Sequence, residues 1–140
     1  TLFPYTTLFR SGKPFTEETL ETILKALDEP FVRGLSLLGG DPLEPENEPE
    51  ILKIVEAVRE KFGDTKDVWM WTGRVYGKVK DSPLVNAVDV LIDGPFVQKL
   101  LTKEKNAWCG STNQRIIPIS PAARSTMPSQ LEAHEEHAAN

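Results

Sequence analysis

The sequence predicts an α/β domain with a parallel sheet, and three observations carry this prediction. Apolar runs of strand length alternate with segments of helical periodicity from Gly12 to Ile119. Such alternation implies right-handed βαβ units, which place successive strands parallel to one another. Three of the apolar runs end in small polar turns, as strands do at the ligand-binding edge of such sheets. The 140 residues, 39% of them hydrophobic, suit a single core.

The first predicted helix begins after Thr16, whose hydroxyl can cap the first turn. Glu17 and Glu18 lie where the helix dipole favours negative charge. The apolar stripe of this helix consists of Leu20, Ile23, Leu24 and Leu27. Pro30 ends the helix, and the apolar run over residues 32–38 predicts the strand that follows.

The second predicted helix opens at Asn47 and Pro49 and ends at Gly63, a residue suited to a helix C-cap. Its apolar stripe consists of Ile51, Val55, Val58 and Phe62. A compact apolar strand over residues 68–71 then leads into Thr72.

The second half of the chain predicts shorter elements. Residues 76–86 are partly helical, residues 88–92 form a strand, and residues 96–101 form a short helix. The run over residues 115–119 predicts a last strand, and Pro118 places it at the edge of the sheet because proline has no N–H to donate.

Composition excludes several classes of function. The net charge is −5 with Lys and Arg scattered along the chain, so we expect no nucleic-acid partner. No apolar run approaches the length of about 20 residues that spans a membrane. Cys109 is the one cysteine, so the 140 residues hold neither an internal disulfide nor a cysteine-rich metal site. We expect a cytoplasmic protein that does not bind a membrane.

The two ends of the chain differ from the part between them. Residues 1–11 have no sustained periodicity and resemble a translated sequencing adapter, so we expect them to be non-native. Residues 120–140 have almost no large apolar side chain and are expected to form a disordered tail. His134 and His137 in this tail lack the H-E-x-x-H zinc spacing. The domain is therefore expected over residues 12–119.

Small polar turns follow three of the predicted strands. They are Gly39-Gly40-Asp41-Pro42, Thr72-Gly73 and Asp93-Gly94. Because parallel strands end at one edge of a sheet, we expect Asp41, Thr72 and Asp93 around one crevice that accepts a ligand with an amine and ribose hydroxyls. A fourth polar cluster, residues 110–114, includes Asn113, whose amide can hold a ligand or a partner backbone.

Four segments in this order resemble a known family. They are residues 35–43 (LSLLGGDPL), 69–73 (WMWTG), 90–96 (VLIDGPF) and 110–117 (GSTNQRII). Together they are similar to the activating protein of the anaerobic (class III) ribonucleoside-triphosphate reductase. That family belongs to the radical S-adenosylmethionine enzymes and is close to the pyruvate formate-lyase activating enzyme.

The resemblance implies a partial (β/α) barrel of parallel strands that binds S-adenosylmethionine. Gly39, Gly40, Asp41 and Pro42 match the motif that holds the amino end of the methionine moiety. Thr72, Gly73, Asp93 and Asn113 are expected around the rest of the cofactor.

The implied reaction begins when a flavodoxin-like or similar electron donor reduces a [4Fe-4S] cluster, which then passes one electron to the sulfonium. The C–S bond breaks, and the 5′-deoxyadenosyl radical takes a hydrogen atom from a glycine of the large reductase subunit. The resulting glycyl radical starts ribonucleotide reduction.

One departure from the family pattern is large. The family binds its cluster through a C-x-x-x-C-x-x-C loop upstream of the part that begins here near Gly12, and residues 1–11 stand in that place without a cysteine. Three thiolates are needed, and Cys109 alone does not supply them. We therefore expect an inactive fragment that lacks the first strand and the cluster loop, with no catalytic residue and no metal ligand of its own.

Three alternatives stay open. The intact protein activates another glycyl-radical enzyme, such as pyruvate formate-lyase, or the chain is a non-catalytic nucleotide-binding α/β module. In the third, Asp41 and Asp93 hold Mg²⁺ for phosphoryl chemistry, although the chain has no Gly-Lys-Ser/Thr phosphate loop.

Overall fold

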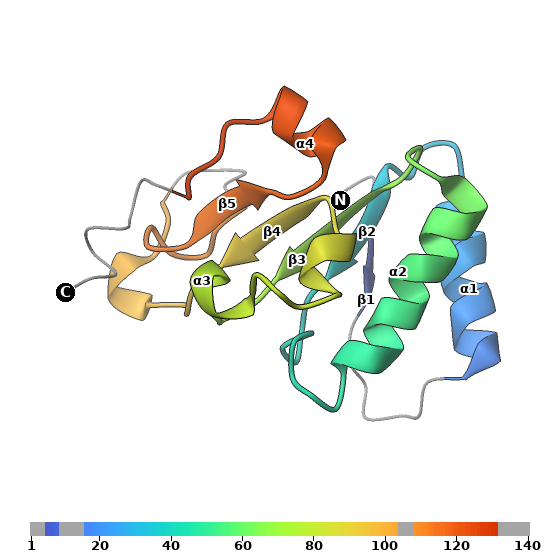
Figure 1. Ribbon diagram of the computed structural model, residues 1–140, viewed down its shortest axis with the longest axis horizontal. Coiled ribbons are helices and arrows are strands. Elements are labelled where there is room, and N and C mark those ends of the chain that lie inside the picture. Colours follow the sequence, from blue (N-terminus) through green and yellow to red (C-terminus); the bar gives the residue numbers. More distant parts are fainter. Residues whose placement is uncertain (1–4, 9–15, 104–107, 132–140) are drawn as a thin grey trace.

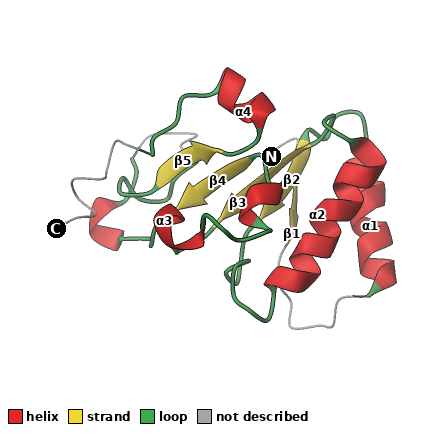
Figure 2. Ribbon diagram, viewed as in Figure 1, coloured by secondary structure: helices red, strands yellow, loops and turns green. Residues whose placement is uncertain are grey.

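A computed structural model describes residues 5–8, 16–103 and 108–131 of the chain, with only the backbone described for residues 5–8 (Figures 1 and 2). The strands are β1 (Tyr5–Leu8), β2 (Gly34–Leu37), β3 (Asp67–Trp71), β4 (Val90–Asp93) and β5 (Arg115–Pro118). The α-helices are α1 (Glu17–Leu27), α2 (Glu48–Phe62), α3 (Tyr76–Val79) and α4 (Pro121–Thr126), and η1 (Val85–Ala87) and η2 (Gln98–Leu100) are 3₁₀ turns.

The strands of the described sheet lie side by side in sequence order, β1-β2-β3-β4-β5. The first four are parallel, and β5 runs antiparallel to β4. The long helices α1 and α2 lie together on one face of the sheet (Figure 1). Sequential order with helices on one face is the arrangement of a (β/α) barrel rather than of a doubly wound sheet. The predicted α/β class, consistent with a partial radical S-adenosylmethionine barrel, is confirmed.

The helix boundaries also agree with the prediction. The side chain of Thr16 accepts a hydrogen bond from the N–H of Thr19 at 3.3 Å and so caps α1. At the end of α2, the N–H of Gly63 donates to the carbonyl of Arg59 at 2.8 Å. Gly63 has φ of 58°, a conformation that costs glycine little.

The main core lies between the sheet and the helices α1 and α2. Alternate residues of the central strands point into it, and its largest fully buried side chains include Leu35, Leu37, Val68, Met70 and Leu91. The helices contribute Ile23, Leu27, Ile54, Val55 and Val58. Burial of these side chains is the main force that fixes β2, β3 and β4 relative to α1 and α2.

A second, smaller core covers the opposite face of β3, β4 and β5. It consists of Trp69, Val90, Ile92 and Ala123, with Trp71, Cys109, Ile116 and Met127 packed against it. Helix α4, which follows β5 (Figure 2), supplies Ala123, which packs with Trp69, Val90 and Ile92. The sheet is therefore apolar on both faces in this region, as parallel sheets are.

The structure differs from the sequence expectations at both ends. Residues 5–8, which were set aside as non-native, pair in parallel with β2 as strand β1. Residues 120–131, which were expected to be disordered, contain α4, where the side chain of Ser120 accepts from the N–H of Ala123 at 3.2 Å. Composition did not predict this helix, because the residue that the helix buries in the second core, Ala123, is small. His134 and His137 lie outside the described residues.

The expectation of an entirely parallel sheet needs one correction, because β5 is antiparallel to β4. Its place at the edge of the described sheet, which Pro118 predicted, is confirmed. Among the described helices, none has the length and apolar character needed to cross a membrane.

Replacing Gly34 with alanine is expected to lower the free energy of unfolding by at least about 2 kcal/mol. An alanine Cβ at this position would clash with the backbone oxygen of Asp67 on β3. Gly77→Ala is the matched control, since no atom beyond its chain neighbours and its own helix backbone lies within 4 Å of that Cβ. Urea denaturation followed by circular dichroism measures both, and equal stabilities would contradict the close approach of β2 and β3.

Candidate functional site

The loop between β2 and α2 brings exposed backbone to the carboxyl end of the sheet. Gly39 has φ of 98°, in the region that side chains with a Cβ rarely adopt. Gly39 and Gly40 are both exposed, while Pro42 directly after them is buried. The two glycines therefore present main-chain groups to solvent on a turn that is anchored by the residues that follow.

The carboxylate of Asp41 joins this loop to the end of β3. Its Oδ1 accepts from the N–H of Leu43 at 3.0 Å and from the hydroxyl of Thr72 at 2.9 Å. Its Oδ2 accepts from the N–H of Gly73 at 3.0 Å and lies 3.0 Å from the same hydroxyl. The structure thus brings Asp41, Thr72 and Gly73 into direct contact, although 31 residues separate the first two in sequence.

The main chain of the same turn is fixed from the other side. The carbonyl of Asp41 accepts from the side chain of Asn47 and from the N–H of Glu44, each at 3.1 Å. Arg74 lies 3.3 Å from a carboxylate oxygen of Glu44 across the two loops. This ion pair is largely solvated, so it adds little free energy. The glycine turn is therefore held by the hydrogen bonds of Asp41.

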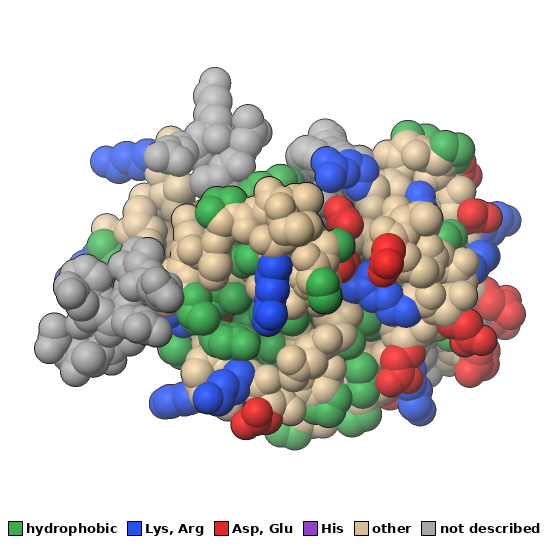
Figure 3. All heavy atoms as spheres, turned by 45° about the horizontal axis from the view of Figure 1, so that its top comes forward, with side chains coloured by type: hydrophobic (Ala, Val, Ile, Leu, Met, Phe, Trp, Pro, Cys, Tyr) green, Lys and Arg blue, Asp and Glu red, His purple; other side chains and the backbone are tan. Residues whose placement is uncertain are grey.

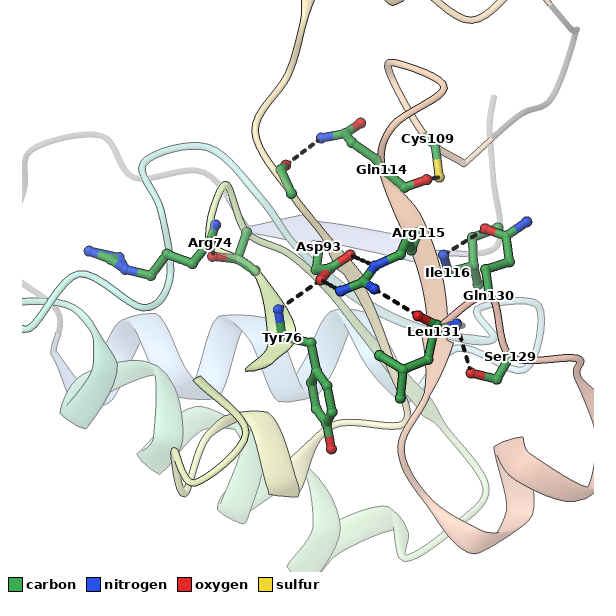
Figure 4. A network of polar contacts seen from close by, with 12 residues as sticks. Arg74, Tyr76, Asp93, Cys109, Gln114, Arg115, Ile116, Ser129, Gln130 and Leu131 are labelled. Carbon is green, nitrogen blue, oxygen red and sulfur yellow. Dashed lines mark hydrogen bonds and ion pairs between the residues drawn. The ribbon is translucent and has the colours of Figure 1, made fainter. Parts of the chain in front are cut away.

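Asp93 ends β4 but belongs to a separate network (Figure 4). Its side chain is 1% exposed, and it accepts from Arg115 Nε at 3.0 Å and Nη2 at 2.6 Å. The N–H of Tyr76 donates to the same carboxylate at 2.7 Å. The hydrogen bonds of Asp93 lead to β5 and α3 rather than to Asp41, so its carboxylate does not share hydrogen-bond partners with the glycine turn.

The amide side chains of the predicted polar cluster, residues 110–114, connect the turn before β5 to the turn after β4. Ser111 donates to Asn113 Oδ1 at 2.6 Å, and Asn113 Nδ2 donates to the carbonyl of Pro95 at 2.8 Å. Gln114 Nε2 donates to the carbonyl of Gly94 at 3.0 Å, and its Oε1 accepts from the N–H of Gly110 at 2.7 Å. These amides bind backbone groups of this chain, and they set the path of the chain after β4.

The sequence reasoning missed an aromatic cluster on the face of β3 opposite α1 and α2. The rings of Trp69 and Trp108 lie 5.0 Å apart between centroids, and those of Trp69 and Trp71 lie 6.1 Å apart. Trp71 Nε1 donates to the carbonyl of Trp108 at 2.8 Å. The period of two that separates Trp69 from Trp71 was the signal available in the sequence.

Cys109 lies beside this cluster and is half-buried. Burial, together with the negative charge of Asp93, raises the pKa of its thiol. The thiol donates to the carbonyl of Gln114 at 3.5 Å. These observations favour a protonated, structural cysteine over a reactive one.

The residues present do not fit an iron–sulfur cluster. A cubane cluster of this family needs three thiolates, and Cys109 is the one cysteine of the 140 residues. Within residues 16–103 and 108–131, no group of three or more His, Cys, Asp or Glu side chains is arranged to hold a metal ion. Asp41 and Asp93 already accept hydrogen bonds within separate networks, which argues against a shared Mg²⁺.

Comparison with known proteins gives consistent matches. Residues 4–117 match the family described as a 4Fe-4S single cluster domain. The anaerobic ribonucleoside-triphosphate reductase-activating protein of Enterobacteria phage T4 is 40% identical over 107 residues, which is 76% of this chain and 67% of that protein. The protein of the same name from Escherichia coli K12 is 40% identical over 109 residues, 74% of this chain and 69% of its own length.

The Vibrio cholerae protein of that name is 39% identical over 110 residues, which is 76% of this chain and 70% of the relative. No solved structure matches the chain significantly.

Asp41→Asn is expected to lower the free energy of unfolding by about 1–3 kcal/mol, because an amide NH₂ would face one of the donors that the carboxylate now binds. Glu44→Gln is the matched control, since its ion pair with Arg74 is solvated. Chemical denaturation measures both variants. If Asp41→Asn is as stable as the parent chain, the bridge between the β2 and β3 loops does not contribute as described.

Proposed function

The chain belongs to the family of anaerobic ribonucleoside-triphosphate reductase-activating proteins, with its radical S-adenosylmethionine-type 4Fe-4S domain, and we propose that it forms the S-adenosylmethionine half of such an activating site. The observation that carries the proposal is the exposed Gly39-Gly40 turn that Asp41 fastens to Thr72 and Gly73. This turn lies at the carboxyl edge of a partial barrel, where such folds bind their ligands.

The chemistry of the turn suits the methionine end of S-adenosylmethionine. That end carries an ammonium group, which needs acceptors, and a carboxylate, which needs donors. The exposed backbone of Gly39 and Gly40 offers both, and the absence of side chains allows close approach. We also assign Pro42 to the site for the methionine end, because this buried residue stiffens the chain directly after the two glycines. In the intact activating protein, one electron from a reduced [4Fe-4S] cluster would cleave the C–S bond of the bound cofactor to give methionine and a 5′-deoxyadenosyl radical.

In this proposal the other predicted site residues act by fixing, through hydrogen bonds, the main chain around the ligand. Thr72 and Gly73 border the glycine turn directly through Asp41. Asp93 fixes the N–H of Tyr76, and Asn113 fixes the carbonyl of Pro95. We therefore assign Asp93 and Asn113 to the positioning of the loops after β3 and β4, around the adenosine part of the ligand.

The partner in this proposal is the large subunit of an anaerobic ribonucleoside-triphosphate reductase, on which the radical would be transferred to a glycine. The names of the phage, Escherichia coli and Vibrio cholerae relatives favour this partner over pyruvate formate-lyase. A flavodoxin-like protein is the proposed electron donor, and the cytoplasm is the proposed location. One thiolate does not hold a cubane cluster, so we propose that the 140 residues by themselves are not catalytic.

Anaerobic reconstitution of the 140 residues with iron and sulfide is expected to give no stable absorbance near ~400 nm, because three thiolates are required. Cys109→Ser is the matched control and should retain the same small amount of iron as the parent chain. A full-occupancy cluster, measured by iron and sulfide analysis, would contradict the proposal that this chain assembles none.

Gly39→Ala is expected to abolish saturable binding of S-adenosylmethionine, measured by equilibrium dialysis, because a Cβ at φ of 98° distorts the turn that meets the ligand. Gly63→Ala is the matched control, since Gly63 also has a positive φ but lies at the end of α2. It should lose stability and keep the binding. Absence of saturable binding by the parent chain up to about 1 mM, equivalent to about −4.1 kcal/mol, would overturn the proposed ligand site.

A further inference from the structure

Charge is distributed unevenly along this acidic chain. Residues 94–131 contain five of the 16 basic residues and one of the 21 acidic residues. The acidic side chains visible in Figure 3 lie mostly on the side of α1 and α2. Residues 94–131 are thus a cationic segment of a protein whose net charge is −5, and three acidic residues, Glu132, Glu135 and Glu136, follow it in the sequence.

Exposed apolar side chains gather in the same part of the chain. The large hydrophobic residues exposed in the described structure are Phe31 (73%), Phe96 (52%), Leu100 (43%), Leu101 (50%) and Trp108 (44%). Four of these five lie within residues 96–111, the connection between β4 and β5. Single exposed apolar residues are ordinary, but a group of them indicates an interaction surface. We call residues 96–103 and 108–111 the docking surface.

Backbone hydrogen bonding joins the two sides of the docking surface. Its two sides form an antiparallel bridge between Leu101 and Ser111, and the N–H of Thr102 donates to the carbonyl of Gly110 at 3.0 Å. The ring of Phe96 packs on Gly110, where an added Cβ would lie 3.1 Å from the ring. A preformed surface loses less conformational entropy on binding, which favours recognition of a partner.

The docking surface is continuous with the candidate site. It follows directly after Gly94, whose N–H donates at 2.9 Å to the carbonyl of Arg74, the residue after Gly73. At its other end Trp108 packs on Trp69. A molecule bound to the docking surface would therefore lie beside the loop after β3, whose Thr72 and Gly73 contact Asp41 of the glycine turn.

We propose that the docking surface binds the partner protein through an apolar segment flanked by acidic side chains. Lys99 and Lys103 are exposed within it, and residues 94–131 contain five basic residues against one acidic residue, Glu104. Charge complementarity therefore selects an acidic rim on the partner. A protein fits better than a membrane because hydrogen-atom transfer requires contact between the reacting groups, so the partner must reach the ligand edge. The identity of the partner, the large reductase subunit, rests on the proposed function.

The test measures binding of the 140-residue chain to the purified large subunit of the anaerobic reductase from the same organism, by biolayer interferometry. Phe96→Ser and Leu100→Ser are each expected to weaken binding at least about 10-fold, the loss typical of an interface hot spot. Phe31→Ser is the matched control, because Phe31 is also exposed but lies between α1 and β2. It should leave the affinity unchanged. Thermal unfolding confirms that each variant is folded.

Charge reversal tests the second half of the proposal. Lys99→Glu is expected to weaken binding more at low salt than at high salt, whereas Lys53→Glu, on the exposed side of α2, should have no effect. Binding that is unchanged in Phe96→Ser and Leu100→Ser, or absent in the parent chain, would overturn the docking surface. Preferential binding to phosphatidylserine vesicles would also overturn it. Dialysis with S-adenosylmethionine is independent of these outcomes, so it separates failure of the docking surface from failure of the ligand site.

Discussion

The buried pair of Asp93 and Arg115 fixes the second half of the molecule. Two buried charges lose their hydration, and this free-energy cost is offset only when nearly every donor and acceptor of the pair is hydrogen-bonded. Here Arg115 donates to both carboxylate oxygens and also to the carbonyl of Leu131 at 2.8 Å, while Tyr76 supplies a further N–H. Four segments therefore meet at one ion pair: the end of β4, the start of β5, the start of α3 and residue 131 (Figure 4). Their mutual placement determines where the loops beside the glycine turn lie.

Much of the fold follows from hydrophobic periodicity. Two features specify both the elements and the face that each element buries. They are the apolar stripes of α1 and α2 and the apolar runs of β2, β3 and β4. The direction of β5 does not follow, because a period of two is the same for parallel and antiparallel strands. Strand β1 and helix α4 were missed for another reason. Residues 5–8 were set aside because they lack sustained periodicity, and β1 is placed by its pairing with β2. Helix α4 is placed by the contact of the small residue Ala123 with the second core.

The candidate site was predictable in part. Parallel strands end at one edge, and this rule alone brings Asp41 to Thr72 and Gly73. The rule says nothing about which way a side chain points. Asp93 alternates with Ile92 and so shares the face of Leu91, where it meets Arg115, 22 residues away in sequence. An ion pair over that separation depends on the register between β4 and β5, which only the folded sheet defines.

The aromatic cluster has a practical consequence. The chain contains three tryptophans, and Trp69, Trp71 and Trp108 all lie together on the face of the sheet away from α1 and α2. The tryptophan fluorescence of this protein therefore originates from one place, beside the connection from β4 to β5. Tryptophan emission therefore reports conformational changes on that side of the sheet, and changes confined to α1 and α2 should leave it unaltered.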